Sequence, residues 1–131
     1  MHPDLERALR PVLDDLRATS GPLPRRVDAG WPGDSQEDDG PPTARAMLWG
    51  RAGGQGVFVE LRLPLPHQVA QVADGVQDWV VEELWGCAPT NWPRCPLHPD
   101  THPLEARVRV AAAWWTCPRD DVPVSEVGRL R

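Results

Sequence analysis

Two cysteines and two histidines in the last third of the chain follow the spacing of metal ligands. Cys95 and His98 are separated by two residues, His102 follows after three more, and Cys117 follows after a further fourteen. Two thiolates and two neutral imidazoles form a tetrahedral set of sulfur and nitrogen donors, which suits zinc. A bound metal also explains how residues 86–103 become ordered, because they contain too little apolar surface to fold alone. The sequence therefore predicts a zinc site.

Each of these cysteines follows a tryptophan by two or three positions and directly precedes a proline. The two segments read Trp92-x-x-Cys95-Pro96 and Trp115-x-Cys117-Pro118. Zinc ribbons place two such knuckles at the ends of a hairpin around one metal, and residues 92–130 resemble a degenerate zinc ribbon. The resemblance implies one zinc ion held between the two segments.

The usual Cys-x-x-Cys pairs of zinc ribbons are altered here, which leaves the fourth ligand open. The first knuckle reads Cys95-x-x-His98 and the second reads Cys117-x-x-Asp120. We favour His102 over Asp120, because a set of two cysteines and two histidines has no net charge with zinc bound. Carboxylates are also less usual in closed structural sites. Cys87 is a weaker candidate, and a small buried residue is the simpler interpretation of it.

The chain carries little that indicates a catalytic metal. A catalytic zinc keeps an open coordination position beside a general base, and no His-Glu-x-x-His or His-x-Glu element is present. We therefore predict that the zinc is structural. One alternative is a small metal-dependent hydrolase or transferase that uses Asp120 or Glu105 as its base. Another is a disulfide between Cys95 and Cys117, which leaves both histidines unexplained.

Hydrophobic periodicity divides the chain into two parts. Residues 1–86 are predicted to form an α-β-β-β-α domain, with a mobile acidic loop at residues 33–43. Its predicted elements are a helix over 4–18 that starts or kinks at Pro11, an edge strand within 23–32, strands over 44–50 and 57–63 joined by a turn at 53–56, and a helix over 67–85. Residues 87–131 are predicted to form a zinc knuckle and a β-hairpin packed on this domain, with the hairpin running from Glu105 to Thr116.

The predicted fold class is therefore α+β. It consists of a small antiparallel β-meander packed with two helices, followed by a zinc-bound knuckle and a β-hairpin.

Seven tryptophans accompany a single phenylalanine. We assign Trp49 and Trp79 to the core. Trp114 and Trp115 are adjacent on a predicted strand, so their side chains point to opposite faces and cannot both enter one core. An exposed tryptophan beside arginines is typical of interface hot spots, and we interpret Trp114 and Trp115 as interface residues.

Composition limits the remaining functional classes. The chain lacks lysine, isoleucine and tyrosine, which indicates a GC-rich coding bias such as that of actinobacteria. A net charge of −5 argues against a nucleic-acid partner, although a zinc-ribbon regulator remains an alternative. No apolar run is long enough to span a membrane, and no basic targeting segment begins the chain. We expect a small cytoplasmic binding or adaptor protein that contacts another protein.

Overall fold

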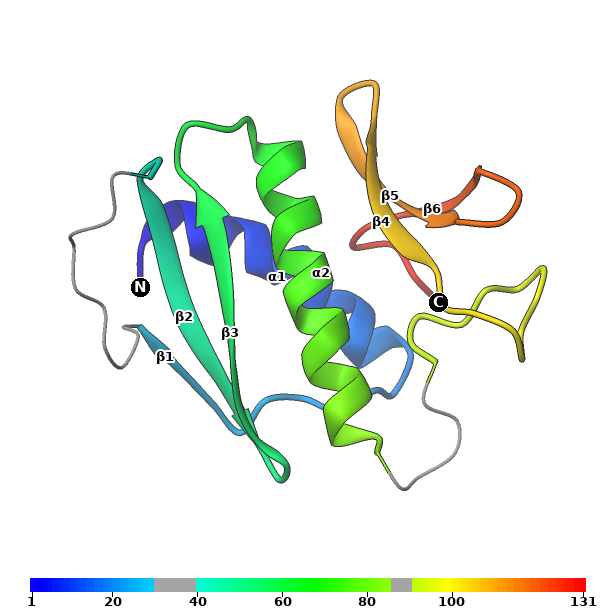
Figure 1. Ribbon diagram of the computed structural model, residues 1–131, viewed down its shortest axis with the longest axis horizontal. Coiled ribbons are helices and arrows are strands. Elements are labelled where there is room, and N and C mark those ends of the chain that lie inside the picture. The colour runs from blue at the N-terminus through cyan, green and yellow to red at the C-terminus, as the bar shows by residue number, and fades with distance from the viewer. Residues whose placement is uncertain (30–39, 86–90) are drawn as a thin grey trace.

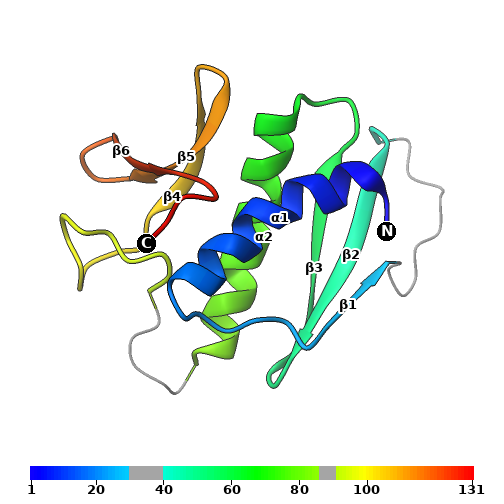
Figure 2. The ribbon, with the colours of Figure 1, turned by 180° about the vertical axis from the view of Figure 1, so that it is seen from behind.

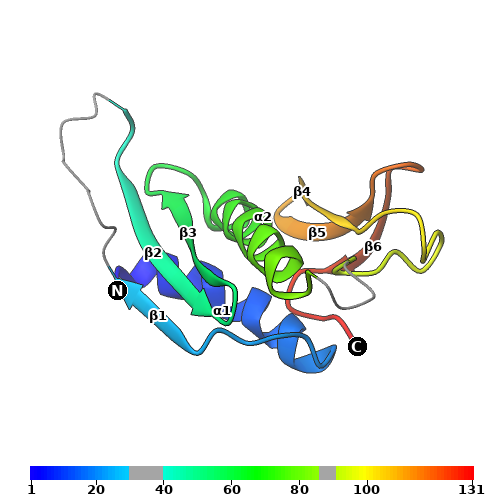
Figure 3. The same ribbon diagram turned by 60° about the horizontal axis from the view of Figure 1, so that its bottom comes forward.

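Two helices form a layer between two three-stranded antiparallel sheets in the computed structural model, which describes residues 1–29, 40–85 and 91–131 (Figures 1 and 3). The elements are α1 (Pro3–Ala18), β1 (Arg26–Ala29), β2 (Thr43–Gly50), β3 (Gly53–Glu60), α2 (Leu65–Glu83), β4 (Glu105–Arg109), β5 (Ala112–Cys117) and β6 (Val122–Glu126). Figure 2 shows α1 crossing α2 on the side opposite to the view of Figure 1. The α+β class is thus confirmed. Neither described helix is long and apolar enough to cross a membrane.

The first sheet has the order β1-β2-β3 and turns one face toward the helices. Alternate residues of β2 and β3 supply that face, which is buried: Ala44, Ala46, Leu48, Val57 and Val59. The residues between them point away from the helices, as strand alternation requires. Trp49 lies on this outer face, where the guanidinium of Arg26 is 5.2 Å from the centre of its ring. The assignment of Trp49 to the core is therefore wrong, whereas Trp79 of α2 is buried as predicted.

Gly75 allows α2 to approach this sheet closely. A glycine inside a helix costs about 1 kcal/mol relative to alanine, so its presence needs a reason. A Cβ atom at position 75 would lie 2.8 Å from Cγ1 of Val57 on β3, closer than real Cβ contacts. Gly75 therefore lowers the helix propensity of α2 but allows the helix to pack closely against β3.

Several predicted boundaries differ from the structure. The glycine-rich residues 53–56 belong to β3, and the turn that precedes them is formed by Arg51 and Ala52. Alpha-helix α1 continues through Pro11. Strand β6 was not predicted, and it extends the C-terminal hairpin to a three-stranded sheet of order β4-β5-β6. Residues 33–39 of the predicted acidic loop lie outside the described residues.

Buried residues from both predicted parts of the chain form one hydrophobic cluster. The division of the chain at residue 86 stays a prediction.

Asp15 links α1 to the second sheet and to the chain end that follows it. This side chain is fully buried. Its Oδ2 accepts hydrogen bonds from the indole Nε1 of Trp115 at 2.8 Å and from the backbone N–H of Gly128 at 2.7 Å. Its Oδ1 accepts the backbone N–H of Leu130 at 2.9 Å. One carboxylate therefore satisfies three donors from a distant part of the sequence.

The environment of Asp15 changes its acidity. Burial raises the pKa of Asp15 above its ordinary value of 3.8, and the three hydrogen bonds, which favour the ionised form, offset only part of that effect. Because the folded-state pKa is raised, the folded chain binds the proton of Asp15 more tightly than the unfolded chain does. This adds to the free energy of unfolding, and the contribution is fully present below pH 3.8. That contribution is lost as the pH rises through the folded-state pKa. At neutral pH Asp15 therefore stabilises the fold by accepting hydrogen bonds from three donors.

Replacing Asp15 by alanine should lower the free energy of unfolding by about 3 kcal/mol, because the buried indole N–H of Trp115 and two partly buried backbone N–H groups lose their acceptor. Urea denaturation at neutral pH measures this. Asp14→Ala is the matched control, since its carboxylate is exposed and its hydrogen bond is to Arg17. The control makes the same change in helix propensity and should stay within about 0.5 kcal/mol of the wild type. Equal losses in the two variants would contradict the role given to Asp15.

Candidate metal centre

Residues 92–104, which precede β4, form a loop whose two ends are held together. The backbone N–H of Leu104 donates to the carbonyl of Pro93 at 2.8 Å, and Arg94 and Pro103 form an isolated antiparallel bridge. Gln77 of α2 reinforces this neck, because its Nε2 donates to the carbonyls of Trp92 at 3.0 Å and of Leu104 at 2.6 Å. Both limbs of the loop are therefore fixed to the same helix position.

Trp92 ties the loop to α1 and β5. Its Nε1 donates to Oγ1 of Thr19 at 3.0 Å, just beyond the end of α1. Its ring meets that of Trp115 edge to face, with the ring centres 5.4 Å apart. Trp115 in turn donates to Asp15. The two tryptophans that precede the cysteines in the sequence thus pack together and position Cys95 and Cys117 on neighbouring backbone.

Four donor atoms converge between the loop and the end of β5. One ligand atom from each of Cys95, His98, His102 and Cys117 lies within 4.8 Å of all the others. The distance from His98 Nδ1 to His102 Nε2 is 3.2 Å, and those from His98 Nδ1 to the Sγ atoms of Cys95 and Cys117 are 3.8 and 3.5 Å. Tetrahedral zinc, with bonds of about 2.0 Å to nitrogen and about 2.3 Å to sulfur, separates its donors by about 3.3–3.8 Å. These three distances lie close to that range, as does the 3.9 Å between Sγ of Cys117 and Nε2 of His102.

The polar contacts of the two histidines outside the cluster direct lone pairs into it. Nδ1 of His102 is 2.9 Å from the carbonyl oxygen of Pro103, which can only accept, so Nδ1 carries the proton and Nε2 has the lone pair. Nε2 of His98 is 3.5 Å from Oδ2 of Asp120, which leaves Nδ1 of His98 to face the cluster. Two imidazole lone pairs 3.2 Å apart repel each other unless a proton or a metal cation lies between them. Metal-binding histidines are commonly oriented in this way by a carbonyl or a carboxylate.

The two cysteines are free thiols and are fully buried, so the disulfide alternative is not realised. Sγ of Cys117 accepts the backbone N–H of Asp120 at 3.5 Å. Asp120 therefore contacts two members of the cluster without joining it: its N–H binds a sulfur, and its carboxylate faces a histidine. Of the two candidates for the fourth position, the structure brings His102 into the cluster and leaves Asp120 beside it.

The remaining predicted site residues fall in different places. Trp115 is fully buried and hydrogen-bonded to Asp15, so an interface role for it is wrong. Trp114 is half-buried on the opposite face of β5, where its neighbours across the strands are Arg107 and Glu126. Cys87 lies outside the described residues. Sequence reasoning missed the supporting residues Asp15, Thr19 and Gln77, because a polar residue on a helix carries no signal of a partner in a distant loop.

Comparison of this chain with protein-family models, with curated proteins and with solved structures finds no match. Inferences about its chemistry therefore depend on the geometry of the cluster and its surroundings.

Replacing His102 by alanine should lower the affinity for Zn²⁺ by more than about 100-fold, since losing a ligand costs more than losing a residue that only orients one. Asp120→Ala should lower it by about tenfold, because this change removes only the carboxylate beside His98. Competition with a chromophoric chelator at constant pH measures both. His67→Ala, in the first turn of α2, is the control and should bind Zn²⁺ as the wild type does. A larger loss in Asp120→Ala than in His102→Ala would place the carboxylate in the coordination sphere.

Proposed function

We propose that this chain is a small protein-binding module whose C-terminal part is stabilised by a structural zinc ion. The observation that carries the proposal is the convergence of two thiol groups and two imidazole lone pairs at tetrahedral spacing. Zinc suits this donor set, because mixed sulfur and nitrogen ligands in tetrahedral geometry favour it over the harder cations magnesium and calcium. Cys95, His98, His102 and Cys117 are the proposed ligands.

A structural role fits this site better than a catalytic one. Four protein donors fill a tetrahedral coordination sphere and leave no position for a substrate or an activated water. The two carboxylates considered as general bases are also engaged elsewhere. Asp120 faces Nε2 of His98 at 3.5 Å, and Glu105 forms an ion pair with Arg107 at 3.0 Å. These contacts argue against the hydrolase or transferase alternative.

The position of the cluster explains what the metal would stabilise. Three of the proposed ligands come from the loop that precedes β4, and Cys117 is the last residue of β5. A metal bound by all four would therefore hold the loop against the second sheet. Between Arg94 and Pro103 the loop offers little other apolar burial, because Cys95 is the only buried residue there and Leu97 is 52% exposed. Metal coordination would supply the missing free energy, on the order of 10 kcal/mol in small zinc domains.

The outer face of the second sheet supplies a surface for a protein partner. Trp114 is half-buried there between its cross-strand neighbours Arg107 and Glu126, a composition found at interface hot spots. The arginines of this sheet are already neutralised: Asp121 lies 2.8 Å from Arg107 and 2.7 Å from Arg109. Ion-paired arginines favour a protein surface over a phosphate backbone, which argues against the nucleic-acid regulator.

Removing the metal should loosen residues 92–120 first. Chelation should speed amide exchange in this region by about tenfold or more, whereas the amides of α1 and α2 should keep their protection, because the core between the helices and the first sheet contains no ligand. Hydrogen–deuterium exchange with and without chelator measures this segment by segment. Adding Zn²⁺ back should restore protection. Equal protection of residues 92–120 in both states would overturn the structural role.

Replacing Trp114 by alanine should weaken binding of a protein partner by at least about 2 kcal/mol, or roughly 30-fold, as expected for a hot spot. Quantitative affinity capture from cells that naturally contain the protein measures this. Trp85→Ala is the matched control, since Trp85 is 78% exposed and follows the end of α2 rather than belonging to the second sheet. Both variants should keep the wild-type metal content. Capture that is abolished by nuclease treatment would instead support the nucleic-acid regulator.

A further inference from the structure

A cavity of about 380 Å³ lies where the ends of both helices meet the neck of the loop at residues 92–104. Residues 19–22 border it beyond α1, Leu84 borders it at the end of α2, and residues 91–94 and 130–131 complete the wall. These segments gather at one end of the molecule (Figure 2). The volume falls in the range of small-molecule sites, roughly 300–1,000 Å³, and admits about a dozen non-hydrogen atoms.

One side of this cavity is apolar. Trp92 and Pro93 are buried, and Leu84 and Leu130 are partly buried against the hydrophobic cluster. The side-chain polar atoms on this side are already engaged, because Nε1 of Trp92 donates to Oγ1 of Thr19 and the Thr19 hydroxyl donates to a carbonyl of α1 at 2.8 Å. This side therefore suits the apolar part of a ligand.

Positive charge and free donors line the rest of the cavity. Arg94 and Arg131 belong to its wall, and no aspartate or glutamate among the described residues does. The ion pair of Arg94 is with Asp100 at 3.6 Å, and both side chains are largely exposed, so this contact holds the guanidinium weakly. Ser20 and Asn91 also line the cavity, and their side chains have no hydrogen-bond partner among the described residues. A ligand group with several acceptor atoms fits these donors.

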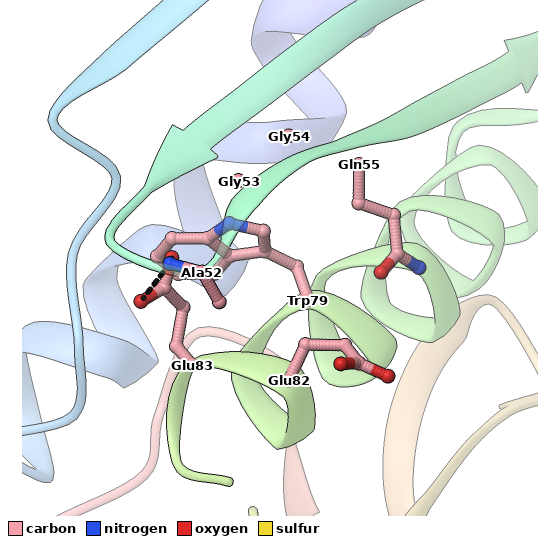
Figure 4. A pocket seen from close by; sticks show the side chains of 7 residues that line it. All are labelled: Ala52, Gly53, Gly54, Gln55, Trp79, Glu82 and Glu83. Carbon is pink, nitrogen blue, oxygen red and sulfur yellow. Dashed lines mark hydrogen bonds between the residues drawn. The ribbon is translucent and has the colours of Figure 1, made fainter.

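A second hollow, of about 230 Å³, has the opposite charge (Figure 4). It lies between α2 and the β2–β3 hairpin, and the charged residues among the described ones that line it are Glu82 and Glu83. Glu83 accepts the backbone N–H of Arg51 at 3.1 Å. The whole chain has a net charge of −5, so a cavity with two arginines and no carboxylate side chain differs from the chain as a whole. An anion is attracted to the first cavity and repelled from the second.

Ser20 occupies a backbone position that glycine would fill with less strain. Its φ is +55°, in the left-handed region. The N–H of Gly21 donates to the carbonyl of Leu16 at 2.8 Å, which is the hydrogen bond that ends a helix when a left-handed residue follows its C-cap. Glycine is usual at that position because it has no Cβ. Serine loses some stability there and adds an unpartnered hydroxyl to a residue of the cavity wall, and such strained conformations concentrate at functional sites.

We propose that this cavity binds a small carboxylate with an apolar chain. The apolar chain lies against Trp92 and Leu84, and the carboxylate faces Arg94, Ser20 and Asn91. A carboxylate accepts about four hydrogen bonds through its two oxygens and pairs with a guanidinium through two parallel N–H groups, so one group serves all three donors. The site is separate from that of the proposed zinc ion, because none of the four proposed zinc ligands lines the cavity.

The probe is octanoate, added to the purified protein and followed through the indole N–H resonance of Trp92 and the amide resonance of Ser20. We expect saturable shifts with a dissociation constant of about 1 mM or lower. 1-Octanol has the same chain without the charge, and octylammonium has the opposite charge. Both should bind this cavity at least about tenfold more weakly, because neither pairs with the guanidinium of Arg94. Equal affinity for the three ligands would contradict the assignment.

Variants separate ligand binding from folding. Arg94→Gln should raise the dissociation constant for octanoate at least about fivefold. Ser20→Gly should raise it about threefold and also raise the midpoint of thermal unfolding, because glycine relieves the left-handed conformation; a merely structural role for Ser20 would leave binding unchanged. Glu82→Gln, in the second hollow, is the control and should bind octanoate as the wild type does. The absence of a shift at Trp92 with about 10 mM octanoate, or unaltered affinity in both the Arg94 and Ser20 variants, would overturn the proposal.

Discussion

A buried carboxylate holds the two halves of this protein in their relative positions. Asp15 comes from the first helix, yet every hydrogen bond to its carboxylate is donated from the last part of the chain, by Trp115, Gly128 and Leu130. Trp115 then contacts Trp92, which binds Thr19 one turn further along the first helix. This circuit brings the loop with three of the proposed ligands next to the strand that carries the fourth. The proposed metal centre therefore depends on contacts made by residues that are not themselves among the four proposed ligands.

A metal ion at the proposed site and the hydrophobic core would stabilise different parts of the chain. The part of the core between the helices and the first sheet is formed mostly by ordinary aliphatic side chains. The loop at 92–104 has few such residues, and polar groups hold its neck. Coordination is an efficient means of ordering a segment of this kind, because it needs four side chains rather than an apolar surface. The fully buried Cys95 and Cys117 belong to both systems.

The sequence was sufficient where its signal was local. Local patterns predicted elements that the structure contains: alternation in Val57 and Val59 predicted a strand, and helical spacing around Val72 and Val76 predicted a helix. The Cys-Pro turns after tryptophans pointed to ligand candidates that do lie together. It was insufficient where the structure of a segment depends on residues that are distant in the sequence. The glycines at 53–56 indicated a turn but belong to an edge strand, and β6 contains Pro123, which is tolerated at a sheet edge and hides its strand pattern. Nothing local indicates that Asp15 is buried or that Gln77 binds two carbonyls.

The hydrogen bonds of Gln77 lower the entropic cost of binding an ion in the loop. Its amide fixes both limbs of the loop, so the entropy of bringing the loop ends together is already lost in the folded chain. For a loop of this length that entropy corresponds to a cost on the order of 3 kcal/mol. A free peptide with the same cysteines and histidines would have to meet this cost on binding. A residue that touches no ligand thereby raises the effective concentration of the donors around one another.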